Sequence, residues 1–285
     1  MNFLGLPGRE EARVALIPAP LELTTSWKKG TSEAPLEILK VSPNMEFFDD
    51  EFFLSPVERP GFFTYPLLEL DFDIEAAFNQ VQAMVRDALE KKRFPILIGG
   101  EHTVSLAGVS EVKKFFPELK LVHLDAHLDL RDSYRGTKVN HATVMRRIRD
   151  LGVDIISIGI RSICEEEYEF LKKNGHQVLW AKTWFESKEK VLNEIERFVK
   201  DDPVYLSLDV DVFDPSVVPG TGTPEPGGLF WWDVLEILKR VAKANLVAAD
   251  LVEVRPLGEP PITEYLAAKL IFKLGVYLRV FKWRI

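Results

Sequence analysis

Residues 119–129 read Leu-Lys-Leu-Val-His-Leu-Asp-Ala-His-Leu-Asp, a mostly apolar run that ends in alternating polar residues. The apolar part, Leu119–Leu124, lacks strict alternation, which is typical of a strand buried on both faces in a parallel sheet. In extended chain, residues i, i+2 and i+4 lie on one face, so Asp125, His127 and Asp129 can converge on one point. This stretch therefore predicts a buried strand with a polar site at its carboxyl end.

Similar short runs recur along the chain and alternate with longer amphipathic stretches. We expect strands at Val14–Ile17, Pro95–Ile98, Leu119–Leu124, Asp154–Ile158, Gln177–Trp180, Val204–Leu208 and Leu246–Val254. We expect helices at Ile74–Lys92, Val104–Phe115, Thr143–Leu151, Glu165–Lys173, Lys188–Val199, Trp231–Ala244 and Ile262–Val280. This alternation predicts right-handed crossovers and an open sheet covered on both faces. No repeat or linker divides residues 1–285, so we expect a single α/β domain; residues 47–72, rich in aromatics and interrupted by Pro, receive no assignment.

The composition excludes several classes of protein. Hydrophobic residues make up 46% of the chain and charged residues 28%, which fits a globular enzyme and not a disordered or fibrous chain. The formal net charge of −8 argues against nucleic acid or an anionic membrane as partner, because both need clustered Lys and Arg. A single cysteine, Cys164, and an amino terminus without the features of a signal peptide favour a cytoplasmic location. No apolar run approaches the ~20 residues that cross a bilayer.

Polar residues follow several predicted strands at the edge where open α/β sheets bind their ligands. Six of them could ligate metal: His102, Asp125, His127, Asp129, Asp209 and Asp211. Four carboxylates in one crevice would raise each other's pKa, and two divalent cations would relieve that repulsion. The set therefore predicts a two-metal hydrolytic site. Ligation dominated by oxygen, without thiolate, favours Mn²⁺, with Fe, Co, Ni or Zn as alternatives.

Each motif also has an ordinary structural interpretation. An isolated Asp-x-Asp is usually a solvated loop or a cap, and Gly-Gly-Glu-His at residues 99–102 could be a tight turn followed by a helix cap. Asp-x-His-x-Asp at the end of a buried strand is harder to explain structurally, because unpaired buried acids are costly. The occurrence of all three groups at strand ends of one sheet favours the metal site.

At these residues the sequence resembles the ureohydrolase family, which includes arginase and agmatinase. The matching motifs are Gly99-Gly-Glu-His102, Asp125-Ala-His-Leu-Asp129, Ser207-Leu-Asp-Val-Asp-Val-Phe-Asp-Pro215, Pro219-Gly-Thr-Gly-Thr-Pro-Glu-Pro-Gly-Gly228 and Asp250-Leu-Val-Glu-Val254. The resemblance implies a three-layer αβα fold with a mostly parallel sheet of roughly eight strands, two Mn²⁺ ions per chain, and a homo-oligomer, either trimer or hexamer. It also implies that His102, Asp125, Asp129 and Asp209 hold one ion, and Asp125, His127, Asp209 and Asp211 the other.

Three further residues have catalytic roles by the same resemblance. A guanidinium carbon is a poor electrophile, so water must be activated by metal and the substrate cation must be held by a carboxylate. Glu253 matches the family's guanidinium-binding acid, and Asp129 is expected to pass on the proton of the attacking water. His141 matches the family's catalytic histidine and is the expected proton shuttle. His123 is expected to be a packed group beside the metal strand, and His176 a surface residue.

Several features resemble agmatinases more than arginases. Glu225-Pro226 stands where arginases have apolar residues, and Arg161-Ser162 where arginases have an Asp that binds the substrate's α-amino group. Asn140 keeps one amide near the position of the arginase segment that binds the α-carboxylate. The resemblance therefore implies hydrolysis of agmatine to putrescine and urea, with Asn140 and Arg161 as further substrate-binding residues. Arginase, guanidinobutyrase, formimidoylglutamase and guanidinase activities remain alternatives, all on small cationic or amidine substrates.

Four other classes of protein compete with this hypothesis. A metallophosphatase would need a downstream Gly-Asn-His-type motif, and the sequence has none. A cysteine-dependent amidine hydrolase would need Cys164, but the acids that follow it would raise the pKa of the thiol. A non-catalytic scaffold would not need the whole set of ligands. A phosphate-binding loop at residues 220–228 would lose N–H donors to its prolines.

Overall fold

The computed structural model describes residues 1–283 and contains an eight-stranded sheet in which all paired strands are parallel. The strands are β1 (Val14–Ala19), β2 (Phe62–Thr64), β3 (Phe94–Gly99), β4 (Lys120–Leu124), β5 (Asp154–Ile160), β6 (Gln177–Trp180), β7 (Pro203–Asp209) and β8 (Asn245–Val252). Their order in the sheet is β2-β1-β3-β8-β7-β4-β5-β6. The central strands β3, β8, β7 and β4 therefore present their carboxyl ends side by side, although they are far apart in sequence.

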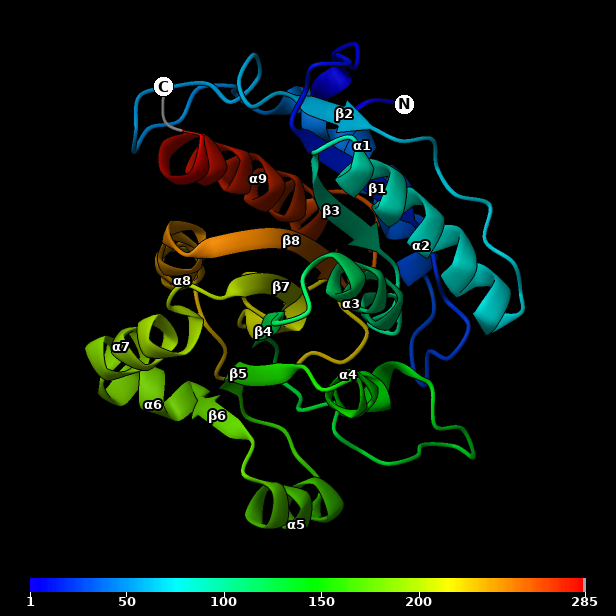
Figure 1. Cartoon of the computed structure of the whole chain (residues 1–285), viewed down its shortest axis with the longest axis vertical. Helices are drawn as coiled ribbons and strands as arrows, with labels where there is room; N and C mark the ends of the chain where they lie inside the picture. The colour runs from blue at the N-terminus through cyan, green and yellow to red at the C-terminus, as the bar shows by residue number, and fades with distance from the viewer. Residues whose placement is uncertain (284–285) are drawn as a thin grey trace.

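Helices cover both faces of this sheet, so the molecule has three layers (Figure 1). They are α1 (Ala34–Val41), α2 (Ile74–Glu90), α3 (Val104–Phe115), α4 (Val144–Asp150), α5 (Glu165–Asn174), α6 (Ala181–Glu186), α7 (Lys188–Val199), α8 (Trp231–Lys243) and α9 (Ile262–Tyr277). Helices α2, α3 and α4 pack on one face, and α7, α8 and α9 on the other. This arrangement confirms the predicted αβα architecture.

Neighbouring residues of each strand contribute to two different hydrophobic cores. In β4, Val122 and Leu124 pack into the core that includes α8 and α9, and Leu121 packs into the core with α2 and α3. Both faces of the strand are thus buried, as the lack of polar alternation predicted. The result is a rigid central sheet whose carboxyl edge can hold side chains in fixed positions.

The structure differs from the sequence-based expectation mainly in short elements. Strand β2 lies within the unassigned residues 47–72 and pairs with β1, but its three residues are too few to show a period. Helices α1 and α6 were not expected, and they have only eight and six residues. Strand β8 ends at Val252, so Glu253 lies just beyond it. The last helix, α9, ends at Tyr277 and continues as a π-helical turn over Leu278–Lys282.

A row of polar side chains crosses four adjacent strands behind this carboxyl edge. Ser157 in β5, His123 in β4, Ser207 in β7 and Asp250 in β8 are successive register partners. Register partners on adjacent strands point to the same face, and these four are at most 2% exposed. Such a row is unusual in a buried sheet, because each polar group needs a partner there.

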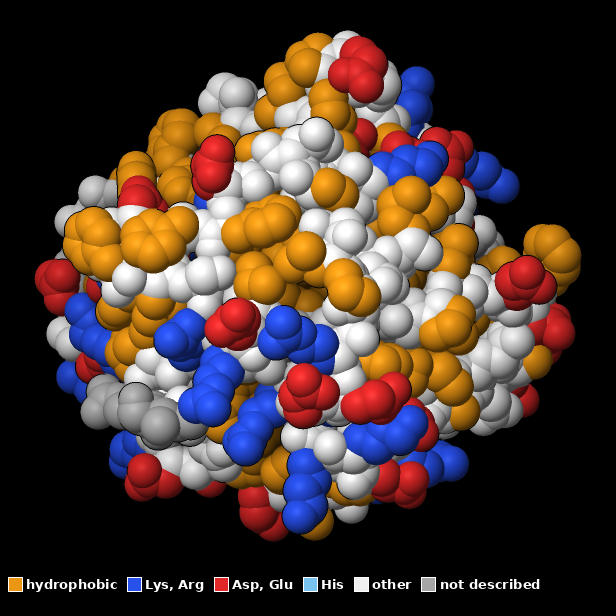
Figure 2. Space-filling model, turned by 90° about the horizontal axis from the view of Figure 1, so that it is seen from above, with side chains coloured by type: hydrophobic (Ala, Val, Ile, Leu, Met, Phe, Trp, Pro, Cys, Tyr) orange, Lys and Arg blue, Asp and Glu red, His pale blue; other side chains and the backbone are white. Residues whose placement is uncertain are grey.

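Part of the acidic excess is internal rather than on the surface. Asp125, Asp129, Asp209 and Asp211 are between 0% and 8% exposed, although they belong to the 44 acids that outnumber 36 basic residues. On the face drawn in Figure 2, acidic and basic side chains are interspersed with hydrophobic ones and form no single-sign patch. Among the helices of residues 1–283, none combines the length and the apolar character that a bilayer span requires.

Candidate metal centre and active site

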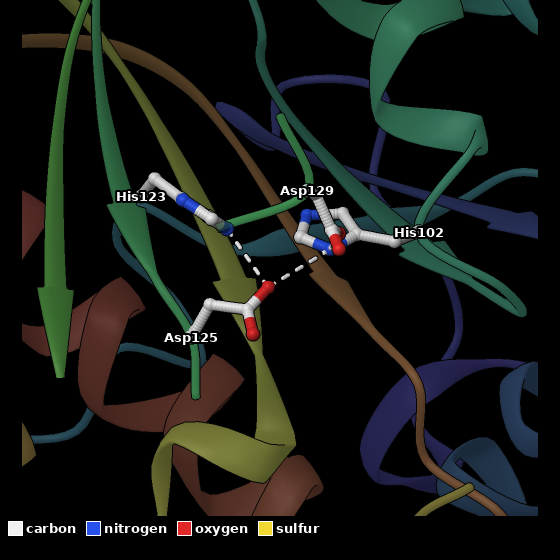
Figure 3. Close-up of side chains that lie close together, drawn as sticks. All are labelled: His102, His123, Asp125 and Asp129. Atoms are coloured by element: carbon white, nitrogen blue, oxygen red, sulfur yellow. Dashed lines mark hydrogen bonds and ion pairs between the residues drawn. The ribbon is translucent and has the colours of Figure 1, made fainter. Parts of the chain in front are cut away.

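Three carboxylates from the ends of two strands, β4 and β7, surround the imidazole of His102, which itself follows β3. Its Nδ1 lies 3.2 Å from Asp125 Oδ2, 3.1 Å from Asp129 Oδ2 and 3.4 Å from Asp209 Oδ2. Figure 3 shows His102 and His123 on the two sides of Asp125, with Asp129 next to the ring of His102. All these groups are buried, and Nδ1 of His102 makes no hydrogen bond of good geometry. A buried imidazole nitrogen that faces three carboxylates without a well-aligned hydrogen bond is an arrangement that a cation would complete.

A second group of candidate metal ligands shares Asp125 with the first. His127 Nδ1 lies 2.9 Å from Asp211 Oδ2 and 3.5 Å from Asp125 Oδ1. Asp125 thus directs Oδ2 toward His102 and Oδ1 toward His127. A carboxylate that presents one oxygen to each of two histidines has the geometry of a bridging ligand. Asp209 presents one oxygen to His102, and its Oδ1 accepts a hydrogen bond from the N–H of Asp211 at 2.8 Å.

The pKa values of the clustered acids and histidines show that positive charge stabilises this site. Burial and the neighbouring carboxylates raise the pKa of Asp209 and Asp211 above the ordinary range, and that of Asp129 to about 6. Burial opposes a charge on His127, yet Asp211 and Asp125 outweigh it and raise the pKa of His127 to about 12. Without metal, protons on the histidines therefore offset the acids. Divalent ions would take over this role, so the residues present fit a metal centre.

The ligands themselves are held by further hydrogen bonds. His102 Nε2 lies 3.0 Å from Ser207 Oγ, which donates to Asp250 Oδ1 at 2.8 Å. The N–H of Ala126 donates to Asp211 Oδ1 at 2.9 Å. Groups that orient metal ligands in this way fix which nitrogen or oxygen faces the ion. The polar row across the sheet thus contributes Ser207 and Asp250 to the support of one ligand.

His123 is fully buried beside the metal strand, where the sequence placed it as a packed group. Its Nε2 lies 2.8 Å from Asp125 Oδ2, and its Nδ1 lies 3.0 Å from Ser157 Oγ. Distance alone would admit His123 to the first group of ligands. Because both ring nitrogens already have partners, we assign it to the orientation of Asp125 and not to metal binding.

Glu253 and Asp129 adopt strained backbone conformations, with φ of 63° and 52°. Such values are uncommon in residues with a Cβ and persist where the surrounding structure enforces them, often at functional sites. Glu253 is partly exposed, but desolvation of its carboxyl, together with the charge of Glu101, raises the pKa of that group to about 8. A substrate cation bound beside this carboxyl would stabilise its ionised form.

A cavity of about 200 Å³ opens onto these residues. Asp129, Asp211 and Glu253 line it together with Trp27 and Ile163, of which Trp27 is 72% and Ile163 40% exposed. Carboxylates thus lie in the buried part and apolar side chains at the exposed part. The cavity can admit a small, elongated molecule with a cationic end.

His141 lines the same cavity and contacts a loop that the sequence analysis missed. Its Nε2 lies 3.1 Å from Ser26 Oγ, its Nδ1 3.4 Å from Thr24 Oγ1, and its N–H donates to Thr24 Oγ1 at 3.2 Å. Burial and the charge of His102 lower the pKa of His141 to about 4, so its imidazole is neutral at pH 7. Glu101 holds the loop by accepting a hydrogen bond of 2.7 Å from the N–H of Thr24.

A signal for this loop was available in the sequence. The hydroxyl residues Thr24, Thr25 and Ser26 follow β1 after a short turn, at the same edge of the sheet as the metal motifs. The rule that ligand sites lie beyond the carboxyl ends of parallel strands applies to β1 as well. Glu101 belongs to the Gly-Gly-Glu-His motif and supports the loop instead of contacting the proposed ions.

Arg161, for which the sequence predicts contact with substrate, makes its hydrogen bonds within the protein. The guanidinium of Arg161 donates to backbone carbonyls, among them those of Asp211 at 2.6 Å and Glu225 at 2.8 Å, and Arg161 does not line the cavity. Its neighbour Ser162 donates to Glu225 Oε1 at 3.0 Å. The two agmatinase-like features thus contact each other, and Arg161 joins the metal-ligand turn to the 225–226 turn.

Asn140, the other residue predicted to bind substrate, also makes its hydrogen bonds within the protein. It is 2% exposed, its Oδ1 accepts from the N–H of Ala142 at 3.0 Å, and its Nδ2 donates to the carbonyl of Tyr134 at 3.0 Å. The side chain therefore caps the short turn that carries His141. Both ends of the amide are engaged in this way, and Asn140 is not among the residues that line the cavity.

The structure corrects the prediction for His176 and agrees with the one for the glycine-rich segment. His176 is not a surface residue: it is 8% exposed, and its Nε2 lies 2.8 Å from Ser157 Oγ. The glycine-rich segment is a structured loop, because the N–H groups of Gly227 and Gly228 donate to Asp214 Oδ2 at 2.9 and 3.2 Å. These donors are therefore engaged within the chain and do not form a phosphate cradle.

Comparison with known proteins agrees with the fold and the site. A model of the Arginase family matches residues 12–276. The chain is 38% identical to the N(1)-aminopropylagmatine ureohydrolase of Thermococcus kodakarensis, over 92% of this chain and 90% of that one. It is 34% identical to the agmatinase of Pyrococcus horikoshii, over 92% and 91%. The structure of the agmatine ureohydrolase of Thermoplasma volcanium superposes with a TM-score of 0.90 at 31% identity, covering 100% of this chain and 97% of that chain.

These findings define a metal-dependent hydrolase with an arginase-like αβα fold. The chain belongs to the arginase family, and its relatives include agmatinases and aminopropylagmatine ureohydrolases.

Proposed function

We propose that this protein hydrolyses the guanidino group of agmatine to putrescine and urea at a centre of two divalent ions, with Mn²⁺ preferred. One observation carries the proposal: Glu253 lines the same cavity as Asp129, Asp209 and Asp211. A carboxylate for the guanidinium cation therefore lies beside the proposed metal ligands. The likeness to agmatinases and to the agmatine ureohydrolase structure supports the substrate class.

The metal ligands and the substrate-binding acid have separate roles in this proposal. His102, Asp125, Asp129 and Asp209 would hold one ion, and Asp125, His127, Asp209 and Asp211 the other. When bound, such ions lower the pKa of water toward neutrality and polarise the substrate. Glu253 orients the guanidinium through charge-assisted hydrogen bonds, whose strength grows in the buried site.

Proton transfer then falls to two side chains on the cavity wall. Asp129, which lines the cavity beside the proposed ions, is placed to accept a proton from the attacking water. His141, held by Thr24 and Ser26, is neutral and can carry a proton to the departing amine. The amine then leaves in its ammonium form.

A longer substrate, N(1)-aminopropylagmatine, is the second candidate. Relatives of that name are 34% and 38% identical to this chain, as similar as the agmatinases. Both substrates carry the same guanidino group, so the metal centre and Glu253 serve either. The part of the cavity near Trp27 and Ile163 would distinguish them, since only the longer molecule reaches far beyond the buried end.

A cysteine-dependent reaction has less support than the metal-dependent one. Cys164 lines the cavity, but burial and the charge of Glu167 raise the pKa of its thiol. A raised pKa lowers the fraction of thiolate, which is the nucleophile.

We further propose that the protein acts in the cytoplasm and that it forms a trimer or hexamer. Light scattering of the purified protein tests the oligomeric state.

Release of urea after loading with Mn²⁺ tests the proposal. Agmatine, N(1)-aminopropylagmatine, arginine, guanidinobutyrate and guanidine are compared by kcat/KM on the same preparation. We expect agmatine to give the highest value. Preference for arginine or guanidinobutyrate would refute the assigned substrate, and full activity after exhaustive chelation would refute the metal centre. Parallel assays with Fe²⁺, Co²⁺, Ni²⁺ and Zn²⁺ identify the metal that supports turnover best.

A further inference from the structure

A chain of hydrogen-bonding side chains runs from Asp125 away from the cavity along one face of the sheet. His123 Nε2 lies 2.8 Å from Asp125 Oδ2, and His123 Nδ1 lies 3.0 Å from Ser157 Oγ. Ser157 Oγ lies 2.8 Å from His176 Nε2, and Arg149 Nη1 lies 3.1 Å from His176 Nδ1. His123 and Ser157 are register partners in β4 and β5, which explains why they meet. These hydrogen bonds thus link Asp125, a proposed bridging ligand, to the guanidinium of Arg149 on α4.

The donors in this chain can point in only one direction. A guanidinium has no acceptor, so Arg149 must donate to Nδ1 of His176. The proton of neutral His176 then lies on Nε2, which donates to Ser157 Oγ. The hydroxyl of Ser157 is left to donate to Nδ1 of His123. His123 carries its proton on Nε2 and donates to Asp125, and each contact has one hydrogen.

The surroundings of His176 agree with this assignment. Burial and the positive charge of Arg149 lower the pKa of His176 to about 3, so the ring is neutral at pH 7. Arg149 itself is half-buried and is held by the carbonyl of Asn174 at 3.4 Å and by the ring of Phe170, whose centroid lies 5.6 Å from its guanidinium. It therefore sits at the outer end of the chain, where a substitution disturbs little of the core.

We propose that Arg149 is a positioning residue that sets the tautomers of His176 and His123 and thereby the orientation of Asp125. The inference rests on the proposed role of Asp125 as a metal ligand. A donor fixed at Oδ2 holds the carboxylate in one orientation and leaves Oδ1 directed toward His127. Loss of the terminal donor lets both imidazoles exchange tautomers, and His123 then no longer donates to Asp125 in every molecule. Groups of this kind typically change metal affinity by about 10–100-fold.

¹⁵N NMR of metal-free protein labelled at its histidines reports the tautomers directly. The whole protein contains five histidines, so five imidazoles give signals. In the wild type we expect His123 and His176 to show a pyrrole-type Nε2 and a pyridine-type Nδ1. Arg149→Met should give mixed tautomers at both residues, and Arg149→Lys, which keeps a donor without an acceptor, should restore the wild-type pattern. Arg146→Met is the matched control, because Arg146 lies on the same helix and stacks on Phe170 but makes no contact with His176.

Mn²⁺ titration gives the second readout. We expect Arg149→Met to weaken binding about tenfold relative to Arg146→Met, and to have no further effect in a Ser157→Ala background, where the chain is already broken. Unchanged tautomers in Arg149→Met, or equal affinities of the two methionine variants, would overturn the inference. If the wild type bound no Mn²⁺, the proposed metal centre would be refuted. The tautomers of the metal-free protein would still show in which direction the hydrogen bonds between Arg149 and Asp125 donate.

Discussion

The backbone N–H of His102 donates a hydrogen bond of 2.7 Å to Glu253 Oε1, which joins a proposed metal ligand to the proposed substrate-binding acid. The N–H of Glu253 in turn donates to the carbonyl of Gly100 at 2.8 Å. These bonds link the ends of β3 and β8, which are neighbours in the sheet. The distance between Glu253 and the metal centre is therefore set by the backbone and not by side-chain rotamers alone.

Replacement of Glu253 by Gln should separate substrate binding from metal binding. Gln keeps the oxygen that accepts from His102 but removes the charge that orients the guanidinium. We expect two Mn²⁺ per chain, an unchanged fold, and a loss of kcat/KM of about 100-fold or more. Metal analysis and urea release on the same sample measure both.

Glu118→Gln serves as the control for that variant, because Glu118 is exposed and lies outside the cavity. It should behave as the wild type in both measurements. Loss of metal in Glu253→Gln would contradict its assignment to the substrate and would place it among the ligands.

Uptake of Mn²⁺ at pH 7 should release protons. The pKa of His127 is raised to about 12 and that of His102 well above its ordinary value, so both imidazoles are charged until a metal replaces their protons. We expect a release of at least about two protons per chain, because Asp209 and Asp211, whose pKa values are also raised, can add protons to those of the two imidazoles. A pH indicator in weakly buffered solution measures this release.

Asp211→Asn should bind fewer ions, release fewer protons and lose activity together, because Asp211 belongs to one proposed ligand group. Asp201→Asn, at an exposed position, is the matched control. A variant at position 211 with full metal content and impaired turnover would show that Asp211 does not ligate.

The sequence predicted the strands of the central sheet and the residues at their ends, because buried strands and alternating ligands leave a local pattern. It did not predict the role of Arg161, whose partners are carbonyls up to 65 residues away. Nor did it predict the burial of His176, which depends on the contact of Arg149 and Ser157 with its ring. Both depend on tertiary packing, which no local pattern records.

Replacement of Arg161 by Lys should lower stability more than it changes substrate preference. An ammonium cannot reach the several carbonyls that the planar guanidinium joins, and hydrogen bonds to charged groups contribute about 1.5–3 kcal/mol each. We expect the free energy of unfolding to fall by about 2–4 kcal/mol, with activities on agmatine and guanidinobutyrate reduced by the same factor. Arg197→Lys, at an exposed ion pair, is the control. Normal stability with a higher KM for agmatine alone would restore the substrate-binding role.

His176 should make the metal-free protein sensitive to acid. Its pKa is about 3 in the folded state, because of burial and Arg149, but near 6.5 when unfolded, so only the unfolded chain gains a proton between these values. Stability is therefore complete above pH 6.5 and falls by about 1.4 kcal/mol per unit as the pH decreases toward 3. Between pH 7 and 5, urea unfolding should show the wild type losing about 2 kcal/mol more than His176→Gln, which has no such group to protonate. Because all other titrating groups are common to both proteins, equal losses would mean that His176 is protonated as readily in the folded protein as in the unfolded chain.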